Sequence, residues 1–176
     1  AIRLDLPAPE TAVALNLLFM TGALLIVHAT VRRMDPLRGP AKTALPITPW
    51  LLALTYPFTS FGSSGLETSM AAFFVCLGLY AWISRPDTPG AFCSGLCLIF
   101  STLSRPDHAL FYISMASIIA APIFSRRRNE GYAGVKQLAA FSLPFLLVYL
   151  PYFLWRYTYY GHFFPNTYYA KMADQT

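Results

Sequence analysis

The sequence predicts an all-α integral membrane protein with about six membrane-crossing or membrane-embedded helices. Two observations lead to this fold class. Hydrophobic residues make up 56% of the 176 residues and charged residues only 12%, and the mean hydropathy is +0.47. A soluble domain usually carries about 25% charged residues, so this chain has too few charges to cover a water-soluble globule. Apolar runs close to the length of a bilayer-spanning helix also recur along the chain.

Six apolar segments are expected to form helices, and they cover residues 11–31, 47–59, 68–84, 89–103, 109–124 and 137–155. A spanning helix needs about 20 mostly apolar residues, so 47–59 and 89–103 are short. Prolines also interrupt the second and the last segment. Prolines are tolerated at membrane depth where neighbouring helices or water satisfy the freed carbonyl groups. The short segments are therefore expected to be protein-covered or re-entrant helices beside a cavity.

The residues 1–176 are interpreted as a single transmembrane helical region. The chain begins with Ala1 and has neither an initiator Met nor the basic-then-apolar order of a signal peptide. We therefore expect it to be a fragment, or a chain trimmed at its start.

The distribution of Lys and Arg predicts the orientation. If the six segments alternate and the first runs from outside to inside, the inner loops hold nine of the 13 basic residues, namely Arg32, Arg33, Arg38, Lys42, Arg85, Arg126, Arg127, Arg128 and Lys136. Basic residues are enriched in cytoplasmic loops. The net charge of +5 thus reflects membrane topology, and no nucleic-acid partner is expected.

This orientation gathers the polar motifs on the outer side. Glu67 lies at the start of the segment 68–84, where Ser63 and Ser64 are plausible N-caps and the helix dipole favours an acid. Glu67 is therefore either a capping carboxylate or a carboxylate at a cavity rim, able to bind a hydroxyl, a metal or a cation.

Arg105, Asp107 and His108 interrupt an otherwise apolar stretch. Ionisable groups at membrane depth are costly and indicate function by default, although an Arg–Asp pair that only orders a helix break is the alternative. Pro106 is expected to start a second half-helix, whose free N–H groups beside Arg105 suit a phosphate. The similar residues 85–87 lie on the predicted inner side, where a turn and an interfacial Arg suffice.

The stretch 155–171 is the densest in aromatic residues. An aromatic belt at the membrane interface explains part of it. Aromatic faces together with amide and hydroxyl groups also suit a sugar ring, which offers an apolar face and polar edges. The candidate binding residues in this stretch are Arg156, Tyr160, Asn166, Tyr168, Tyr169 and Lys171.

No nucleotide-binding Gly-rich loop, zinc motif or Ser-His-Asp arrangement occurs in the sequence. Cys76, Cys93 and Cys97 lie in apolar segments, where a free cysteine behaves as a small hydrophobic residue. No cofactor is therefore assigned, although a divalent metal is possible.

Three motifs in order carry a family resemblance: SSGLET at 63–68, SRPDH at 104–108 and YYGHFFPNTYYAK at 159–171. Together they resemble bacterial polytopic glycosyltransferases of the GT-C class, and within it the group of the terminal arabinofuranosyltransferase. The resemblance covers roughly residues 60 to 171. It implies a partial GT-C-like helical core in the bacterial inner (plasma) membrane.

The resemblance also implies a reaction. Such enzymes transfer a sugar from a polyprenyl-phosphate donor to a glycan or glycoconjugate acceptor on the extracytoplasmic face. Arg105 or Arg156 would bind the phosphate, and Asn166, Tyr168 and Tyr169 would line the sugar or acceptor pocket. Glu67 and Asp107 would orient a hydroxyl or an Arg.

The catalytic residue is not identified. GT-C enzymes usually carry their catalytic carboxylate in the first extracytoplasmic loop, and this chain is expected to lack that loop and the helices before it. Two other interpretations remain open. Broken helices with charged residues also mark transporters or flippases, and a non-catalytic membrane scaffold subunit would need no lipid-phosphate binding.

Overall fold

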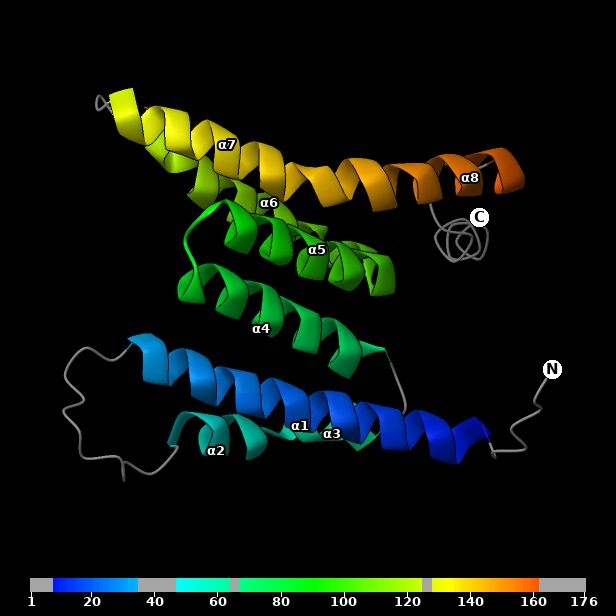
Figure 1. Ribbon diagram of the computed structural model, residues 1–176. Coiled ribbons are helices and arrows are strands. Elements are labelled where there is room, and N and C mark those ends of the chain that lie inside the picture. Colours follow the sequence, from blue (N-terminus) through cyan, green and yellow to red (C-terminus); the bar gives the residue numbers. More distant parts are fainter. Residues whose placement is uncertain (1–7, 35–46, 64–66, 125–127, 162–176) are drawn as a thin grey trace, which may run out of the picture.

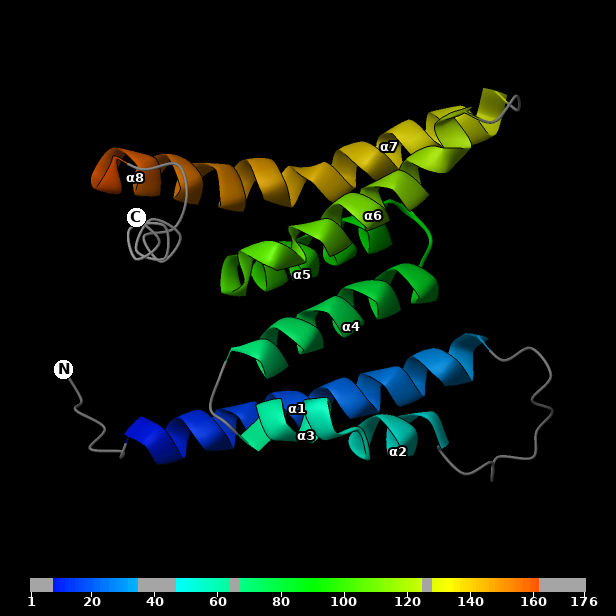
Figure 2. The ribbon, with the colours of Figure 1, turned by 180° about the vertical axis from the view of Figure 1, so that it is seen from behind.

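The structure is a computed structural model that describes residues 8–34, 47–63, 67–124 and 128–161, and these residues form helices joined by short turns (Figure 1). The helices α1, α4, α5 and α7 lie side by side in a row, with α2 and α3 beside α1 and α6 beside α5 (Figures 1 and 2). Successive helical stretches run in opposite directions along the row, as expected for a chain that passes back and forth between two faces.

The helices have the bounds α1 Ala8–Met34, α2 Ile47–Ala53, α3 Tyr56–Ser63, α4 Thr68–Ser84, α5 Thr88–Ser104, α6 Ala109–Ala120, α7 Arg128–Pro144 and α8 Leu150–Tyr160. Short 3₁₀ turns, η1 (Pro106–His108) and η2 (Ala121–Phe124), flank α6, and a π-helical turn, η3 (Phe145–Tyr149), joins α7 to α8. Each of the six predicted segments is helical within the described residues, so the all-helical prediction is confirmed.

Within the described residues, three stretches are long and apolar enough to cross a membrane, namely Glu10–Met34, Pro106–Phe124 and Gly131–Tyr160. The helices α4 and α5 are apolar but have 17 residues each, so they fall just short of a full span. The prediction of about six spans is therefore supported for three of them. The short, broken nature of segment 47–59 is confirmed, because α2 and α3 are separate helices of seven and eight residues.

Two predicted boundaries are wrong. The basic stretch before residue 137 was expected to be a loop, but α7 begins at Arg128. Residues 155–160, expected in the outer loop, belong to α8. The helix extends past both ends of the predicted apolar segment, and neither Pro144 nor Pro151 ends it. A π-helical turn follows Pro144, and Pro151 occupies the first turn of α8, where its missing N–H costs little.

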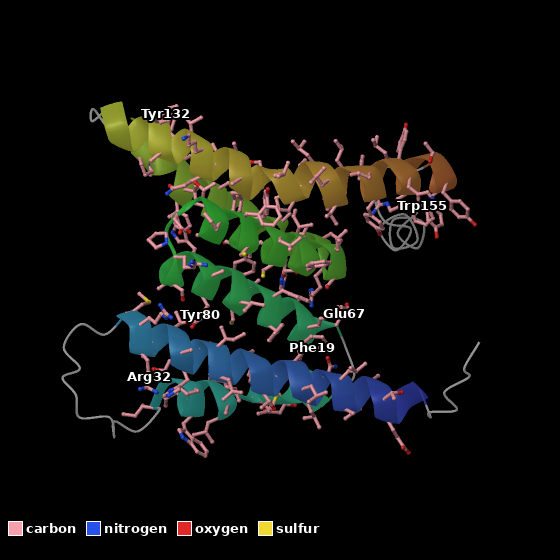
Figure 3. All side chains as sticks on the ribbon, viewed as in Figure 1. Phe19, Arg32, Glu67, Tyr80, Tyr132 and Trp155 are labelled. Atoms are coloured by element: carbon pink, nitrogen blue, oxygen red, sulfur yellow. The ribbon has the colours of Figure 1, made fainter. Side chains whose placement is uncertain are left out.

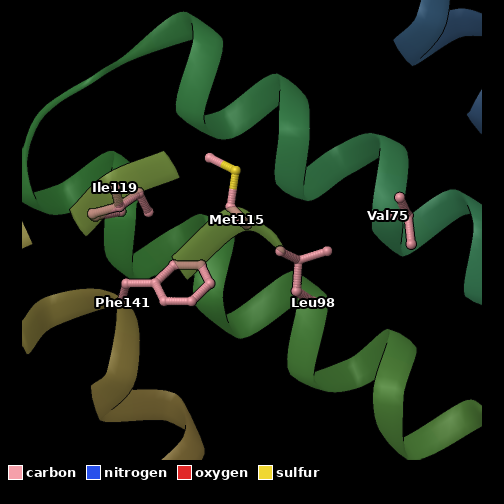
Figure 4. Close-up of a cluster of buried hydrophobic side chains, with 6 residues drawn as sticks. Val75, Leu98, Met115, Ile119 and Phe141 are labelled. Atoms are coloured by element: carbon pink, nitrogen blue, oxygen red, sulfur yellow. The ribbon is translucent and has the colours of Figure 1, made fainter. Parts of the chain in front are cut away.

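The buried core is small and lies where α4, α5, α6 and α7 meet (Figure 4). It consists of Val75, Ala91, Leu98, Met115, Ile119 and Phe141. Tyr112 stacks on Phe141, with ring centroids 4.6 Å apart, and donates a hydrogen bond of 3.2 Å to the Phe141 carbonyl oxygen. Gly95 permits this approach of α5 to α7, since a Cβ there would overlap the same carbonyl oxygen.

Large apolar side chains cover much of the outer surface of the helices. Leu18, Leu25, Leu110, Ile113 and Leu147 are all more than half exposed. A water-soluble protein of this size would bury such side chains, whereas lipid tails are an apolar solvent for them. The surface therefore agrees with the three membrane-crossing stretches.

The two ends of the helical row differ in chemistry. Figure 3 shows Arg32 and Tyr132 at one end and Glu67 and Trp155 at the other. The first end carries the junction of α4 with α5. The second carries the start of α4 and the junction of α5 with α6, so the polar motifs at 67–68 and 104–108 share one end.

Candidate functional site

Arg105 is the centre of a polar cluster between the end of α5 and the start of α4. Its Nε and Nη2 donate to the two carboxylate oxygens of Asp107 at 3.1 and 2.9 Å. Its Nη1 donates to Oγ1 of Thr68, the first residue of α4, at 3.0 Å. Because three hydrogen bonds from two helices hold it, the guanidinium has a fixed position. We call Glu67, Thr68, Ser101, Arg105, Asp107 and His108 the Arg105 cluster.

The electrostatics of the cluster favour a permanently charged Arg105. The hydrogen bonds to Asp107 raise the pKa of Arg105 above its ordinary value, burial opposes this, and the charges of Asp107 and Glu67 raise the pKa further. Glu67 thus acts on the guanidinium through space. The Arg105 side chain is 34% exposed and that of Asp107 61%, so the pair lies at a rim that a ligand can reach.

Pro106 explains why the cluster forms at this point in the chain. A residue that precedes proline is driven out of the helical region, and Arg105 is extended, with φ −141° and ψ 115°. The chain then restarts as η1 and continues into α6, as expected from Pro106. This turn brings Asp107 back beside the Arg105 side chain.

The same four residues, SRPD, occur at 84–87 and adopt a different arrangement. There, Asp87 is the N-cap of α5 and accepts a hydrogen bond from the main-chain N–H of Gly90 at 2.9 Å. Asp107 makes no such cap and pairs with Arg105 instead. Helix capping therefore explains the role of Asp87 but not that of Asp107. The ion pair between Arg105 and Asp107 is left available to a ligand.

Ser101 and His108 extend the cluster inward. The Ser101 hydroxyl is fully buried and donates to the main-chain oxygen of Ala71 in α4 at 3.0 Å. The same oxygen of Ser101 lies 2.7 Å from Nδ1 of His108. The ring of Phe111 meets the imidazole edge-on, with centroids 5.2 Å apart. These contacts hold His108 against the α4–α5 interface.

A cavity adjoins the cluster. Its volume of about 310 Å³ is within the usual size range of ligand sites. It lies between the broken pair α2–α3 and the start of α4. Its lining consists of Leu52, Thr55, Pro57, Phe58, Thr68, Ser69 and Ala72. Thr68 belongs to both the cavity and the cluster, so a ligand in the cavity would lie beside Arg105.

A row of aromatic rings runs along α7 and α8 toward the same end. Phe141, Phe145, Tyr149 and Phe153 follow one another at four-residue spacing, with centroids 5.2 Å apart for the second pair and 6.4 Å for the third. The guanidinium carbon of Arg156 lies 5.8 Å from the centroid of the Phe153 ring. We call these four rings the aromatic row.

The structure brings together four of the predicted site residues, namely Glu67, Arg105, Asp107 and His108. Arg156 and Tyr160 are on α8 and belong to a different surface. Tyr160 packs edge-on against Tyr159 at 4.8 Å. The other predicted residues, Asn166, Tyr168, Tyr169 and Lys171, lie outside the described residues.

One local prediction is corrected. Glu67 was expected in the first turn of a helix capped by a serine, but it occupies the N-cap position itself, and no capping hydrogen bond from its side chain is observed. Sequence reasoning also missed Thr68 and Ser101. Thr68 ends the SSGLET motif and could have been suspected, whereas nothing in the sequence distinguishes Ser101 from the other serines of an apolar helix.

In the described part of the chain, no three His, Cys, Asp or Glu side chains gather as a metal site would require. Comparisons with protein-family models, with curated proteins and with solved structures give no match. The Arg105 cluster and its position in the fold are therefore the features that bear on function.

Proposed function

We propose that this protein is a multi-pass membrane glycosyltransferase that takes a sugar from a polyprenyl-phosphate donor and transfers it to an envelope glycan or glycoconjugate. The site would face the extracytoplasmic side of a bacterial plasma membrane. The observation that carries the proposal is the fixed guanidinium of Arg105, held between the end of α5 and the start of α4, which are both apolar helices.

The hydrogen bonds of Arg105 leave room for a phosphate. A guanidinium carries five N–H donors in a planar fork, and contacts to Asp107 and Thr68 occupy three of them. The remaining N–H groups belong to Nη1 and Nη2, the pair of nitrogens at the outer end of the fork. Arg recognises phosphate through such pairs of donors. The carboxylate therefore orients Arg105 without using all of its donors.

The charges favour a sugar phosphate over a bare anion. The cluster contains one cation, Arg105, and two carboxylates, Glu67 and Asp107, so its net charge is negative when His108 is neutral. Carboxylate oxygens accept hydrogen bonds from hydroxyl groups. A ligand with both an anion and several hydroxyls would satisfy this combination, whereas inorganic phosphate would meet two like charges.

The aromatic row supports a lipid-linked donor. Its last three rings, those of Phe145, Tyr149 and Phe153, are partly exposed and form an apolar surface that runs along a membrane-crossing stretch to Arg156. An isoprenoid chain packs well against such a surface, and its phosphate would then reach the end where Arg105 and Arg156 lie. The enrichment of basic residues at the opposite end of the row supports the extracytoplasmic orientation.

The test is a transfer assay with the protein in nanodiscs, a panel of polyprenyl-phosphate sugars and an envelope glycan as acceptor. Arg105→Ala is expected to lower kcat/KM by about 10- to 100-fold, since hydrogen bonds to charged groups contribute roughly 1.5–3 kcal/mol. Arg105→Lys keeps the charge but loses the paired donors, so an intermediate loss is expected. Arg85→Ala is the matched control, because Arg85 lies in the other SRPD copy at the opposite end.

Three results would contradict the proposal. Equal losses in Arg85→Ala and Arg105→Ala would indicate a general effect on folding. Movement of the lipid-linked sugar across the bilayer without transfer would indicate a transporter. Absence of binding to every donor would indicate a scaffold subunit.

A further inference from the structure

The contacts of Ser101 determine which nitrogen of His108 carries a proton. A serine hydroxyl has one hydrogen to donate. The Ser101 oxygen lies 3.0 Å from the Ala71 carbonyl oxygen and 2.7 Å from Nδ1 of His108. If the hydrogen pointed at Nδ1, two oxygen atoms would face each other in a buried site with no hydrogen between them. Both contacts are favourable only when Ser101 donates to Ala71 and Nδ1–H donates to Ser101.

We propose that Ser101 is a positioning residue that fixes His108 as the Nδ1–H tautomer and so presents Nε2 as a hydrogen-bond acceptor for a sugar hydroxyl. The inference rests on the proposed function for the identity of the ligand. The tautomer itself follows from the contacts of Ser101 alone. In neutral histidine, protonation of Nδ1 leaves Nε2 with its lone pair.

The surroundings of the ring direct Nε2 toward the rim of the cluster. Nδ1 faces the buried Ser101, so Nε2, on the other side of the ring, faces away from the α4–α5 interface. The edge-on contact with Phe111 limits rotation of the ring. Asp107 precedes His108 directly in the chain, and the carboxylate of Asp107 forms the ion pair with Arg105. Nε2 therefore supplies a neutral acceptor beside a charged donor.

This arrangement separates two recognition tasks. Arg105 has only donors and suits the phosphate, whereas Nε2 has only an acceptor and suits a hydroxyl. A site that accepts a hydrogen bond from a substrate hydroxyl discriminates strongly against analogues that lack it, because its acceptor is then left unpaired. His108 would thus contribute to the choice of sugar.

The first test reads the tautomer by NMR in protein labelled with a heavy nitrogen isotope at its three histidines, held in nanodiscs. The His108 signals are assigned by their loss in His108→Asn. The wild type is expected to have a protonated Nδ1 and an unprotonated Nε2. Ser101→Ala is expected to shift His108 toward the other tautomer. Ser94→Ala, which changes another fully buried serine of α5, is the matched control and should leave the signals unchanged.

The second test uses two substitutions that each preserve one nitrogen position. An Asn amide is attached at the same distance along the side chain as Nδ1, so His108→Asn keeps the donor to Ser101 and loses the outer acceptor. A Gln amide reaches the position of Nε2. His108→Asn is expected to raise KM for the sugar donor by about tenfold, which corresponds to the loss of one ordinary hydrogen bond. His108→Gln should recover most of that loss.

The outcomes separate this inference from the proposed function. A protonated Nε2 in the wild type would overturn the inference, whether or not sugar is transferred. An unchanged KM in His108→Asn, with active wild type, would overturn the role of Nε2 as acceptor. Absence of transfer by the wild type together with a protonated Nδ1 would contradict the proposed function and support the positioning role of Ser101.

Discussion

Gly95 should be among the least replaceable residues in the core, because α5 and α7 touch there through their main chains. A Cβ at Gly95 would overlap the Phe141 carbonyl oxygen and lie 3.1 Å from its carbonyl carbon. Carbon atoms pack best at about 3.5–4.0 Å, and the overlap with the oxygen is more severe than the contact with the carbon, so α7 would have to move away until both atoms reach ordinary contact distances. A main-chain group cannot rotate out of the way as a side chain can.

The cost of Gly95→Ala has three parts. Overpacking of a core costs about 1–3 kcal/mol. Displacing the Phe141 carbonyl also weakens the hydrogen bond from Tyr112, which contributes about 1 kcal/mol. Alanine regains up to about 1 kcal/mol of helix propensity. The net expectation is a destabilisation of about 2 kcal/mol.

The measurement is unfolding by SDS titration in mixed micelles. Gly131→Ala is the matched control, since a Cβ there would meet only the Ile123 oxygen, at an ordinary 3.6 Å. The control should be neutral or slightly stabilising. Equal midpoints for the two variants would refute the close approach of α5 to α7.

Three further changes test neighbouring parts of the structure. Thr68→Val keeps the side-chain shape but removes the oxygen that accepts the hydrogen bond from Arg105. The affinity for the polyprenyl-phosphate sugar should therefore fall by about tenfold in a binding titration, with unchanged thermal stability. Asp87→Ala removes the N-cap of α5 and should cost about 1 kcal/mol of stability in SDS titration, without affecting sugar transfer. Tyr112→Phe loses the hydrogen bond to Phe141 and should cost about 1 kcal/mol in the same titration while the stacked rings remain.

The apolar pattern was sufficient to predict most helices. The segment 68–84 matches α4 at both ends, and 89–103 differs from α5 by one residue at each end. These helices end where polar residues and prolines cluster, so composition alone marks the ends. The predicted start of the last segment was wrong by nine residues, because α7 begins in a basic stretch that lacks the apolar pattern used to place the segment.

Four of the six residues of the Arg105 cluster were predictable from the sequence, but their connections were not. Arg105, Asp107 and His108 stood out because they interrupt an apolar stretch, and Glu67 because it starts a helix. The bond from Arg105 to Thr68 spans 37 residues of sequence, and the one from Ser101 to Ala71 spans 30. Such contacts depend on the register between α4 and α5, which no periodicity within either helix specifies.

The two SRPD copies show how much context adds to a local motif. In both copies the preceding helix ends before the proline, which is a property of the motif itself. After the first copy, Thr88 and Pro89 continue directly into an α-helix, and Asp87 is left to cap it. After the second copy the chain makes a 3₁₀ turn, and the neighbouring α4 offers Thr68 as a second partner for the arginine. The ion pair at 105–107 therefore forms where another helix begins alongside, and this packing is what distinguishes the candidate site from the first copy of the motif.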